Sequence, residues 1–329
     1  MSARAALVVN PSSGGRNARG LELAEMLKDA PAVEVLVLER FEQLQPGLER
    51  MRAAGIKALF ISSGDGTIQY IQTWLAERSG LARESWPVLA LLPHGSTNMT
   101  AADIGLKVRS LAAQAELLRA GGLARERARV VARPTVRVAN AAGGAQHGMF
   151  IGAGVLAEAT LFCQHEFNRK GVRGQWGPLL TMLKVGGKAL LRPARPEETE
   201  RVDRPHRMSI MADGAEVARG WQTAMLATTL RKLVLGARPF WGGCAPQAGG
   251  EVMRVSVFGH PPPFLPRWLP VAMYGGERRR VHESMKSLCA QRLVVETDSR
   301  FVMDGEEIPV PQGEPVVIER GPMMRYLVG

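Results

Sequence analysis

Short apolar runs alternate with amphipathic stretches over the first 130 residues of the chain. Four runs have the length and composition of buried strands: Ala5–Asn10, Val33–Leu38, Ala58–Ser62 and Val88–Leu92. Helix-like stretches follow the first and third of them, at Leu21–Lys28 and from Ile68 to about Glu77. Apolar strands that alternate with helices are typical of a parallel sheet covered on both faces. The pattern therefore predicts a doubly wound α/β domain over residues 1–132.

The pattern changes from about Arg133 onward. Short alternating segments, separated by turns that contain glycine or proline, predict seven strands: Thr135–Val138, Met149–Ile151, Arg207–Met211, Trp221–Ala227, Arg254–Phe258, Arg292–Glu296 and Val316–Glu319. A stretch at Leu161–Arg195 is partly helical in character. Many short strands with turns between them favour an antiparallel β-sandwich. The second predicted domain covers residues 133–320.

The charge of the chain indicates an acidic partner. Lysine and arginine exceed aspartate and glutamate by 42 to 31, so the formal net charge is +11. Nucleic acid, anionic lipid headgroups and nucleotide phosphates all fit this excess. With three tyrosines and no RNA-binding aromatic signature, the sequence argues against nucleic acid, because proteins that bind single strands stack bases on aromatic rings.

The cysteines and the apolar runs bear on the compartment. Three widely spaced cysteines show neither zinc-finger nor redox spacing, which favours a reducing cytosol. The start of the chain lacks the pattern of a signal peptide, and no uncharged apolar run reaches the roughly 20 residues that span a bilayer. We therefore expect a cytoplasmic protein that at most lies on a membrane surface. The sequence does not predict the oligomeric state.

Three turns carry the candidate chemistry, and each follows one of the predicted parallel strands. They are Pro11–Gly15, Ser63–Thr67 and Pro93–Asn98. In an open parallel sheet, ligands bind beyond the carboxyl ends of the strands, where all three turns fall. Glycines let backbone N–H groups turn toward an anion, and a following helix adds its positive dipole end. One such turn alone could be an ordinary strand-to-helix connection, but three at matching strand ends favour a phosphate site.

Asp65 lies between two glycines in the second of these turns. A carboxylate in a phosphate-binding turn repels phosphate unless a metal ion or a proton transfer accompanies it. Asp65 is therefore predicted to be more than a helix cap.

These motifs, in this order and spacing, resemble the catalytic domain of the diacylglycerol kinase and sphingosine kinase family. Asn10-Pro11-Ser12-Ser13-Gly14-Gly15 is similar to the first motif of that family, and Ser63-Gly64-Asp65-Gly66-Thr67 to its Gly-Gly-Asp-Gly-Thr signature. The third motif is similar at Pro93, Gly95, Ser96, Asn98 and Ala101. Later segments, Gly242–Ala248 and Met303–Glu306, are also similar to the family.

The resemblance implies an ATP-dependent lipid kinase. Its expected substrate is a hydroxyl of a membrane lipid, either diacylglycerol or a sphingolipid, and its expected cofactors are ATP and Mg²⁺. It implies a nucleotide-binding α/β domain joined to a β-sandwich domain, with ATP in the cleft and residues from about 321 to 329 packed back on the first domain. Either Asp65 or Asp304 is the expected base, with Asp65 and Glu306 as metal ligands. The expected nucleotide-binding residues are Asn10, Pro11, Ser12, Gly14, Ser63, Gly64, Gly66, Thr67, Gly95, Ser96 and Asn98.

Three positions depart from the family pattern. Tyr70 and Met99 stand where acids are usual, and Gly249-Gly250 replaces an Asp-Gly pair. Each change removes one metal contact. The retained Asp65, Asp304 and Glu306 favour a different placement of Mg²⁺ over a loss of activity.

A basic segment between Arg169 and Arg195 holds seven cations and no acid, with leucines and Trp176 interleaved. This composition is typical of a segment that lies on an anionic membrane. Phe264, Trp268 and Leu269 are a second candidate contact. The alternative is a solvated basic face of a core helix.

Other functions stay open at this point. An NAD kinase also carries Gly-Asp-Gly but usually has Asn-Glu where this chain has Asn98-Met99. A non-catalytic lipid- or nucleotide-binding protein is compatible with the missing acids. The G-x-G-x-x-A match at Gly152–Ala157 is interpreted as a tight turn, since no βαβ unit follows it.

Overall fold

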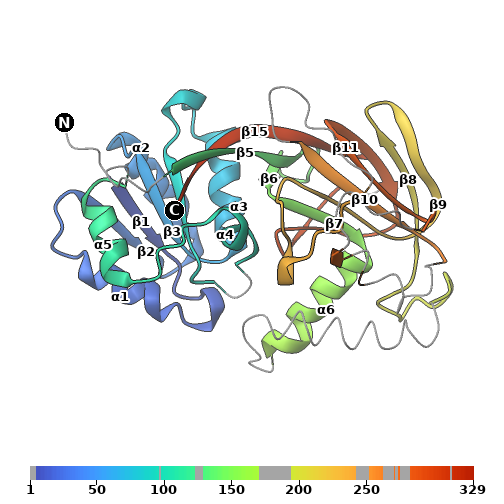
Figure 1. Ribbon diagram of the computed structural model, residues 1–329, viewed down its shortest axis with the longest axis horizontal. Helices are drawn as coiled ribbons and strands as arrows, with labels where there is room; N and C mark the ends of the chain where they lie inside the picture. Colours follow the sequence, from blue (N-terminus) through green and yellow to red (C-terminus); the bar gives the residue numbers. More distant parts are fainter. Residues whose placement is uncertain are drawn as a thin grey trace. The chain divides into compact units, whose positions relative to one another are not determined.

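The computed structural model describes residues 5–95, 98–122, 129–169, 194–241, 252–261, 270, 273–274, 282–311 and 313–329 (Figure 1). The chain divides into two compact units. Unit 1 comprises Met1–Arg133 together with Pro322–Gly329, and unit 2 comprises Pro134–Gly321. A search of the described helices for one that is long and apolar enough to cross a membrane finds none.

Unit 1 contains a parallel sheet in the order β4-β3-β1-β2. Its elements are β1 (Ala5–Val9), α1 (Ala18–Met26), β2 (Val33–Val37), α2 (Leu44–Ala53), β3 (Ala58–Ser62), α3 (Asp65–Thr73), β4 (Val88–Leu92), α4 (Met99–Ile104) and α5 (Leu111–Arg119). The four predicted strands all form, and two of them have the predicted bounds. The fold class predicted for this half of the chain is confirmed.

Helices cover both faces of this sheet because β1, β3 and β4 are buried along their whole length. Leu7 and Val9 of β1 belong to a core cluster with Leu23 of α1 and Leu118 of α5. On β2, Leu36 points to the opposite face, where an added Cβ on Gly47 of α2 would lie 2.2 Å from its side chain. Strands buried on both faces have no polar alternation, which explains the continuous apolar runs in the sequence.

The end of the chain returns to unit 1. Strand β15 (Val316–Val328) begins in unit 2, and its Tyr326 is in parallel register with Leu89 of β4. The buried hydroxyl of Tyr326 accepts a hydrogen bond of 2.8 Å from Nε2 of Gln72 on α3. This contact ties the last strand to the helix that carries Asp65.

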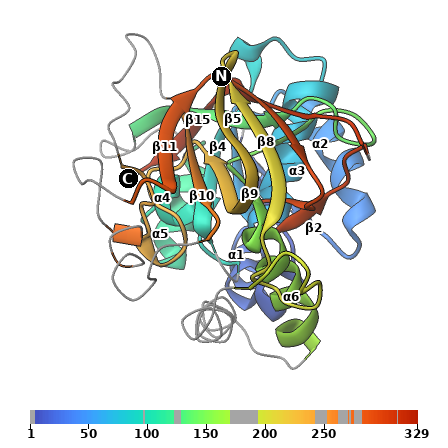
Figure 2. The ribbon, with the colours of Figure 1, turned by 90° about the vertical axis from the view of Figure 1, so that its right-hand side faces the viewer.

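Unit 2 is an antiparallel structure, as predicted. Its strands are β5 (Arg129–Val138, which starts in unit 1), β6 (Gln146–Gly148), β7 (Phe150–Gly154), β8 (His206–Ala212), β9 (Ala215–Thr228), β10 (Met253–Gly259), β11 (Met285–Ala290), β12 (Arg292–Thr297), β13 (Phe301–Met303) and β14 (Glu306–Ile308). The hydrogen-bonded order is β14-β13-β7-β9-β8-β12-β15, with β10 and β11 joined to β9 and β5 to β15. Figure 2 shows β8 to β11 side by side.

One apolar core fills unit 2. Alternate residues of β7, β8, β9, β10 and β12 point into it, for example Ile151, Ile210, Met225 and Val255. Four strands were not predicted: β6, β11, β13 and β14. Three of these have only three residues, too few for an alternating pattern to stand out.

Cys289 on β11 is disulfide-bonded, contrary to the expectation of reduced cysteines.

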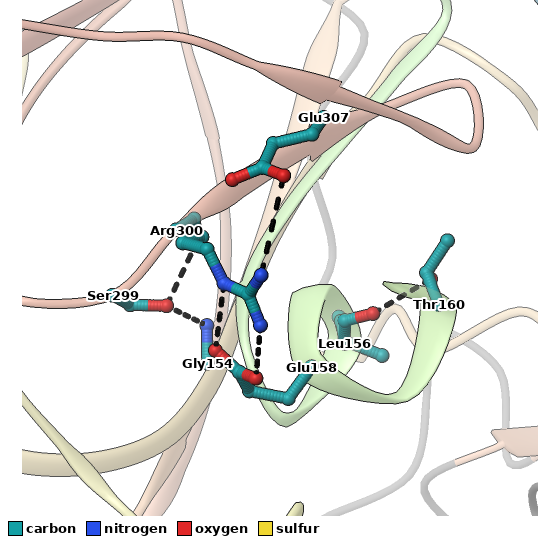
Figure 3. A network of polar contacts seen from close by, with 7 residues as sticks. All are labelled: Gly154, Leu156, Glu158, Thr160, Ser299, Arg300 and Glu307. Atoms are coloured by element: carbon teal, nitrogen blue, oxygen red, sulfur yellow. Dashed lines mark hydrogen bonds and ion pairs between the residues drawn. The ribbon is translucent and has the colours of Figure 1, made fainter. Parts of the chain in front are cut away.

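Helix α6 (Val155–Arg169) follows β7 directly and covers the first part of the stretch expected to be partly helical. Figure 3 shows the contacts at its start, where Arg300 lies between Glu158 of α6 and Glu307 of β14. The backbone N–H of Gly154 donates to Oγ of Ser299 at 2.7 Å. The G-x-G-x-x-A match is thus a strand-to-helix turn, with Gly154 at φ +72° and packed against β9.

Candidate functional site

Three loops of unit 1 meet at the carboxyl ends of the adjacent strands β1, β3 and β4. We call residues 10–17 the first loop, 62–67 the second and 93–98 the third. A Cβ added to Gly95 would lie 2.6 Å from Cα of Gly64, and one added to Gly64 would lie 3.0 Å from Oγ of Ser13. The loops therefore touch through their glycines, as the three sequence motifs predicted.

The first and second loops are joined by Asn10. Its Nδ2 donates to Oγ1 of Thr67 at 3.1 Å, and its Oδ1 accepts the N–H of Ser12 at 3.1 Å. Ser63 adds a hydroxyl hydrogen bond of 2.7 Å to Thr67. These contacts explain why an asparagine begins the first motif and a threonine ends the second.

A buried polar chain joins all three loops. Asn17, the N-cap of α1, donates from Nδ2 to the carbonyl of Ser62 at 2.7 Å and to its hydroxyl at 2.9 Å. The hydroxyl of Ser62 is in turn 2.9 Å from Nδ1 of His94. Asn17, Ser62 and His94 were not among the site residues predicted from the sequence. Their positions directly beside the three glycine turns are the one signal that could have indicated them.

Asp65 is the first residue of α3, and its buried carboxylate points to the third loop. Oδ2 accepts the N–H of Met99, and Oδ1 accepts the N–H of Thr100, both at 3.1 Å. Burial raises the pKa of Asp65, and the two N–H hydrogen bonds oppose that shift. The carboxylate thus caps α4, a role that the sequence analysis considered insufficient to explain an acid at this position.

The third loop closes on itself through Asn98. The Asn98 side chain accepts the N–H of Gly95 at 2.7 Å and donates to the Gly95 carbonyl at 2.6 Å. Asn98 has φ +50°, a left-handed conformation that asparagine tolerates better than most residues. Ser96, an expected nucleotide contact, lies outside the described residues.

The arrangement of the loops offers helix N-termini to an anion. The N–H groups in the first turn of a helix have no partner within the helix, and α1 and α3 each begin at these loops. Gly14 has φ +62°, and the residues where the loops touch are small. The expected nucleotide contacts that the structure describes all lie in the three loops. They are Asn10, Pro11, Ser12, Gly14, Ser63, Gly64, Gly66, Thr67, Gly95 and Asn98.

The two departures within unit 1 have different surroundings. Tyr70 packs edge-on against Phe41 and donates from its hydroxyl to Gln45 at 3.1 Å, so it belongs to the contact between α3 and α2. Met99 is buried, and its backbone N–H rather than its side chain contacts Asp65. Gly249 lies outside the described residues.

Asp304 in unit 2 is buried in the two-residue turn between β13 and β14. It has φ +49°, and Gly305 has φ +96°, so the backbone is not extended there. Its carboxylate accepts the N–H of Met149 at 2.8 Å and of Phe150 at 2.9 Å. The Asp304 carboxylate therefore fastens the turn to the start of β7.

Glu306 follows the turn as the first residue of β14, in register with Met303. Its side chain is exposed, and partial desolvation of the carboxyl raises its pKa. Unlike the carboxylate of Asp304, that of Glu306 accepts no backbone N–H in the contacts within the described residues.

The part of the chain that the structure describes contains no cluster of three acidic, histidine or cysteine side chains that could hold a metal ion. Mg²⁺ in nucleotide sites is commonly bound by one or two carboxylates together with substrate phosphates. The assignment of Asp65 and Glu306 as its ligands stays a prediction.

The membrane contacts predicted from the sequence fall on residues outside the described ranges. Of the basic segment Arg169–Arg195, only residues 169 and 194–195 are described, and Phe264, Trp268 and Leu269 lie outside the described residues. Gly242–Ala248 lies outside them as well.

Residues 4–128 match the family model of the diacylglycerol kinase catalytic domain. A search of curated proteins finds no match. Among solved structures, the chain is similar to a diacylglycerol kinase from Bacillus anthracis strain Sterne, with a TM-score of 0.60 and 15% identity over 98% of this chain and 96% of that one. A second structure from this organism, provisionally assigned as a diacylglycerol kinase, has a TM-score of 0.64 and 16% identity over 98% and 96% of the two chains.

At such identities the structures show a shared fold, and the family model places the three loops in a catalytic domain. Residues 4–128, which contain these loops, are similar to the diacylglycerol kinase catalytic domain, as the motifs predicted.

Proposed function

We propose that this protein is an ATP-dependent lipid kinase that phosphorylates a hydroxyl of a membrane lipid, either diacylglycerol or a sphingolipid. The observation that carries the proposal is the meeting of three glycine-containing loops beside Asp65 in a diacylglycerol kinase catalytic domain. The net charge of +11 supports an acceptor at an anionic surface.

The first two loops would hold the nucleotide phosphates. Asn10 and Ser63 fix the Thr67 hydroxyl between them, and the start of α3 turns N–H groups toward an anion. When bound, ATP with Mg²⁺ supplies the phosphoryl group and neutralises its oxygens. Because these donors are held before binding, little reorganisation is needed when the negative charge arrives.

A carboxylate is needed to take the proton of the acceptor hydroxyl. Asp65 and Asp304 each use both carboxylate oxygens to accept backbone N–H groups, and burial raises the pKa of Asp65. Glu306 is exposed, and its pKa is raised by desolvation, which strengthens it as a base. We therefore extend the proposal by adding Glu306 to Asp65 and Asp304 as a candidate for the proton acceptor.

The proposal is tested by a screen with radiolabelled ATP over diacylglycerol, monoacylglycerol, ceramide and sphingosine in mixed micelles, with NAD as a soluble acceptor. We expect one lipid to be labelled in preference to NAD. Labelling of NAD alone would make the protein an NAD kinase. Binding of ATP without labelling of any acceptor would favour a non-catalytic protein.

Within that assay, Glu306→Gln should lower turnover by about a hundredfold if Glu306 is the base. Glu314→Gln is the matched control, because Glu314 is also an exposed glutamate of unit 2. Equal activity of both variants would remove Glu306 from the mechanism.

Docking at the membrane is a separate part of the proposal. Binding to anionic vesicles should weaken as salt rises, because exposed charges are screened over roughly 8 to 10 Å near physiological ionic strength. Replacing Arg169, Lys170, Arg173 and Lys184 by glutamine should weaken co-sedimentation and raise KM for the lipid, with KM for ATP unchanged. If the quadruple variant binds as tightly as the wild type, the basic segment is a solvated face.

A further inference from the structure

His94 occupies a buried position between two loops of the candidate site. Its Nδ1 lies 2.9 Å from the Ser62 hydroxyl, which already accepts a hydrogen bond from Nδ2 of Asn17. We assign the Ser62 hydroxyl as the donor to Nδ1, so that the ring carries its proton on Nε2. His94 thus accepts a hydrogen bond from the strand that leads into the Asp65 turn.

The third loop is held to the second at both of its ends. At its start, His94 is bonded to Ser62; just beyond its end, the N–H groups of Met99 and Thr100 are bonded to Asp65. Between these attachments Gly95 comes so close to Gly64 that an added Cβ would meet its Cα at 2.6 Å. Two attachments around a tight contact leave the loop little freedom to move as long as both are intact.

From this arrangement we infer that His94 is a positioning residue, which keeps the third loop seated on the second so that the three loops present a formed phosphate site. The inference rests on the proposed nucleotide-binding function of these loops. His94 does not contact the reacting groups in this assignment, since it acts through Ser62 and Gly95.

The unpartnered side of the ring supports a role other than stability. Nε2 of His94 is buried and has no hydrogen-bond partner among the residues that the structure describes, a state that disfavours folding. Burial, together with the charge of Arg19, lowers the pKa of His94 to about 4, so the ring is neutral at neutral pH. A buried residue that lowers the stability of the fold but forms one hydrogen bond beside a ligand site is expected where function is kept at the expense of stability.

Three variants of His94 test the inference, with ATP binding measured by calorimetry and stability by thermal unfolding. His94→Asn keeps an acceptor near the position of Nδ1, His94→Gln places its amide near Nε2, and His94→Leu has neither. We expect His94→Leu and His94→Gln to weaken ATP binding about tenfold, which corresponds to the loss of one hydrogen bond, and His94→Asn to stay within about threefold of wild type. The Tm of His94→Leu should be equal to or above that of the wild type.

Ser62→Ala removes the partner of the same bond. Its effect on ATP binding should not add to that of His94→Leu in the double variant, because the two changes delete one interaction. Additive effects, or failure of His94→Asn to rescue binding, would overturn the assignment. So would a lowered Tm of His94→Leu with unchanged ATP affinity, which would make the bond purely structural.

Amide hydrogen exchange separates this inference from the proposed function. If the wild-type protein binds ATP but labels no lipid, the lipid kinase proposal fails and the binding series still decides the role of His94. If the wild type does not bind ATP, the amides of Gly95 and Met99 become the readout. They should exchange faster in His94→Leu than in wild type, with no change in unit 2; equal exchange would refute the positioning role.

Discussion

Two aspartates, one in each unit, use the same hydrogen-bonding pattern for different purposes. Asp65 accepts the N–H groups of Met99 and Thr100, and Asp304 accepts those of Met149 and Phe150. Both are buried, and both join segments that are distant in the sequence.

Their surroundings differ. Asp65 begins a nine-residue helix, beside loops from three adjacent strands that approach one another through small residues. Asp304 lies in a two-residue hairpin turn with positive φ, and a Cβ added to Gly148 would meet its Oδ2 at 2.6 Å. An acid in a glycine-containing sequence motif is therefore not by itself a catalytic group; the groups around it determine what it can do.

The largest expected effect comes from Asp65→Asn. Loss of the charge should lower turnover by at least about a hundredfold if the carboxylate takes part in phosphoryl transfer. The Nδ2 group of the asparagine would also face a backbone N–H, so that this N–H loses its acceptor. The loss should lower the free energy of unfolding by about 1–3 kcal/mol. Steady-state kinetics and denaturant unfolding measure the two effects separately.

Asp29→Asn is the control for this variant, since Asp29 is an exposed acid of the same unit. If Asp65→Asn loses stability but keeps the turnover of the control, Asp65 and Asp304 are alike after all, and both are structural.

Gly95→Ala tests whether the close approach of the loops matters. Its Cβ would collide with backbone atoms of Gly64 and Ser63, which cannot move as a side chain can. We expect a loss of about 1–3 kcal/mol of stability and a clear loss of ATP affinity in calorimetry. Gly64→Ala is the matched comparison, because its nearest neighbour is the mobile hydroxyl of Ser13 at 3.0 Å, and it should be milder. Equal losses of stability and of ATP affinity in Gly95→Ala and Gly64→Ala would mean that the close contact of Gly95 has no particular importance.

Asp304→Asn is the counterpart of Asp65→Asn in unit 2. It should lower the free energy of unfolding by about 1–3 kcal/mol, because one of the two N–H donors loses its acceptor. At a temperature where the variant is fully folded, turnover should change much less than in Asp65→Asn. A large loss of turnover without loss of stability would instead make Asp304 the base.

The smallest effect concerns pH. The pKa of His94 is about 4 in the folded protein, below its ordinary value of 6.5, so the unfolded chain binds a proton more readily. This contribution to stability is complete above about pH 6.5 and is lost as the pH falls toward 4. The Tm of the wild type should therefore fall more between pH 7 and pH 4.5 than that of His94→Leu. The pKa values of His206 and His260 are also lowered by burial. Because both residues are present in the wild type and in His94→Leu, their contributions to the pH dependence of Tm cancel in the comparison. If the Tm values of the wild type and of His94→Leu change in parallel with pH, the lowered pKa of His94 is contradicted.

Unit 1 was largely predictable because its signals are local. Ala58–Ser62 and Val88–Leu92 form strands with the predicted bounds, and the glycine turns follow them directly along the chain. In a parallel sheet the carboxyl ends of the strands lie at one edge, so the meeting of the loops follows from the order of the elements. Unit 2 was predictable only as antiparallel, since strands such as Phe301–Met303 are too short to carry a pattern.

The sequence by itself determined the fold class, the three glycine loops and the similarity to a diacylglycerol kinase catalytic domain, because each of these depends on residues that are close together in the chain. Tertiary structure alone decided what the polar side chains bind. The partners of Asp65 lie 34 and 35 positions away, that of His94 lies 32 away, and those of Asp304 lie 154 and 155 away. No periodicity in the sequence encodes such pairs, because they depend on which strands become neighbours and on the direction in which each loop leaves its strand.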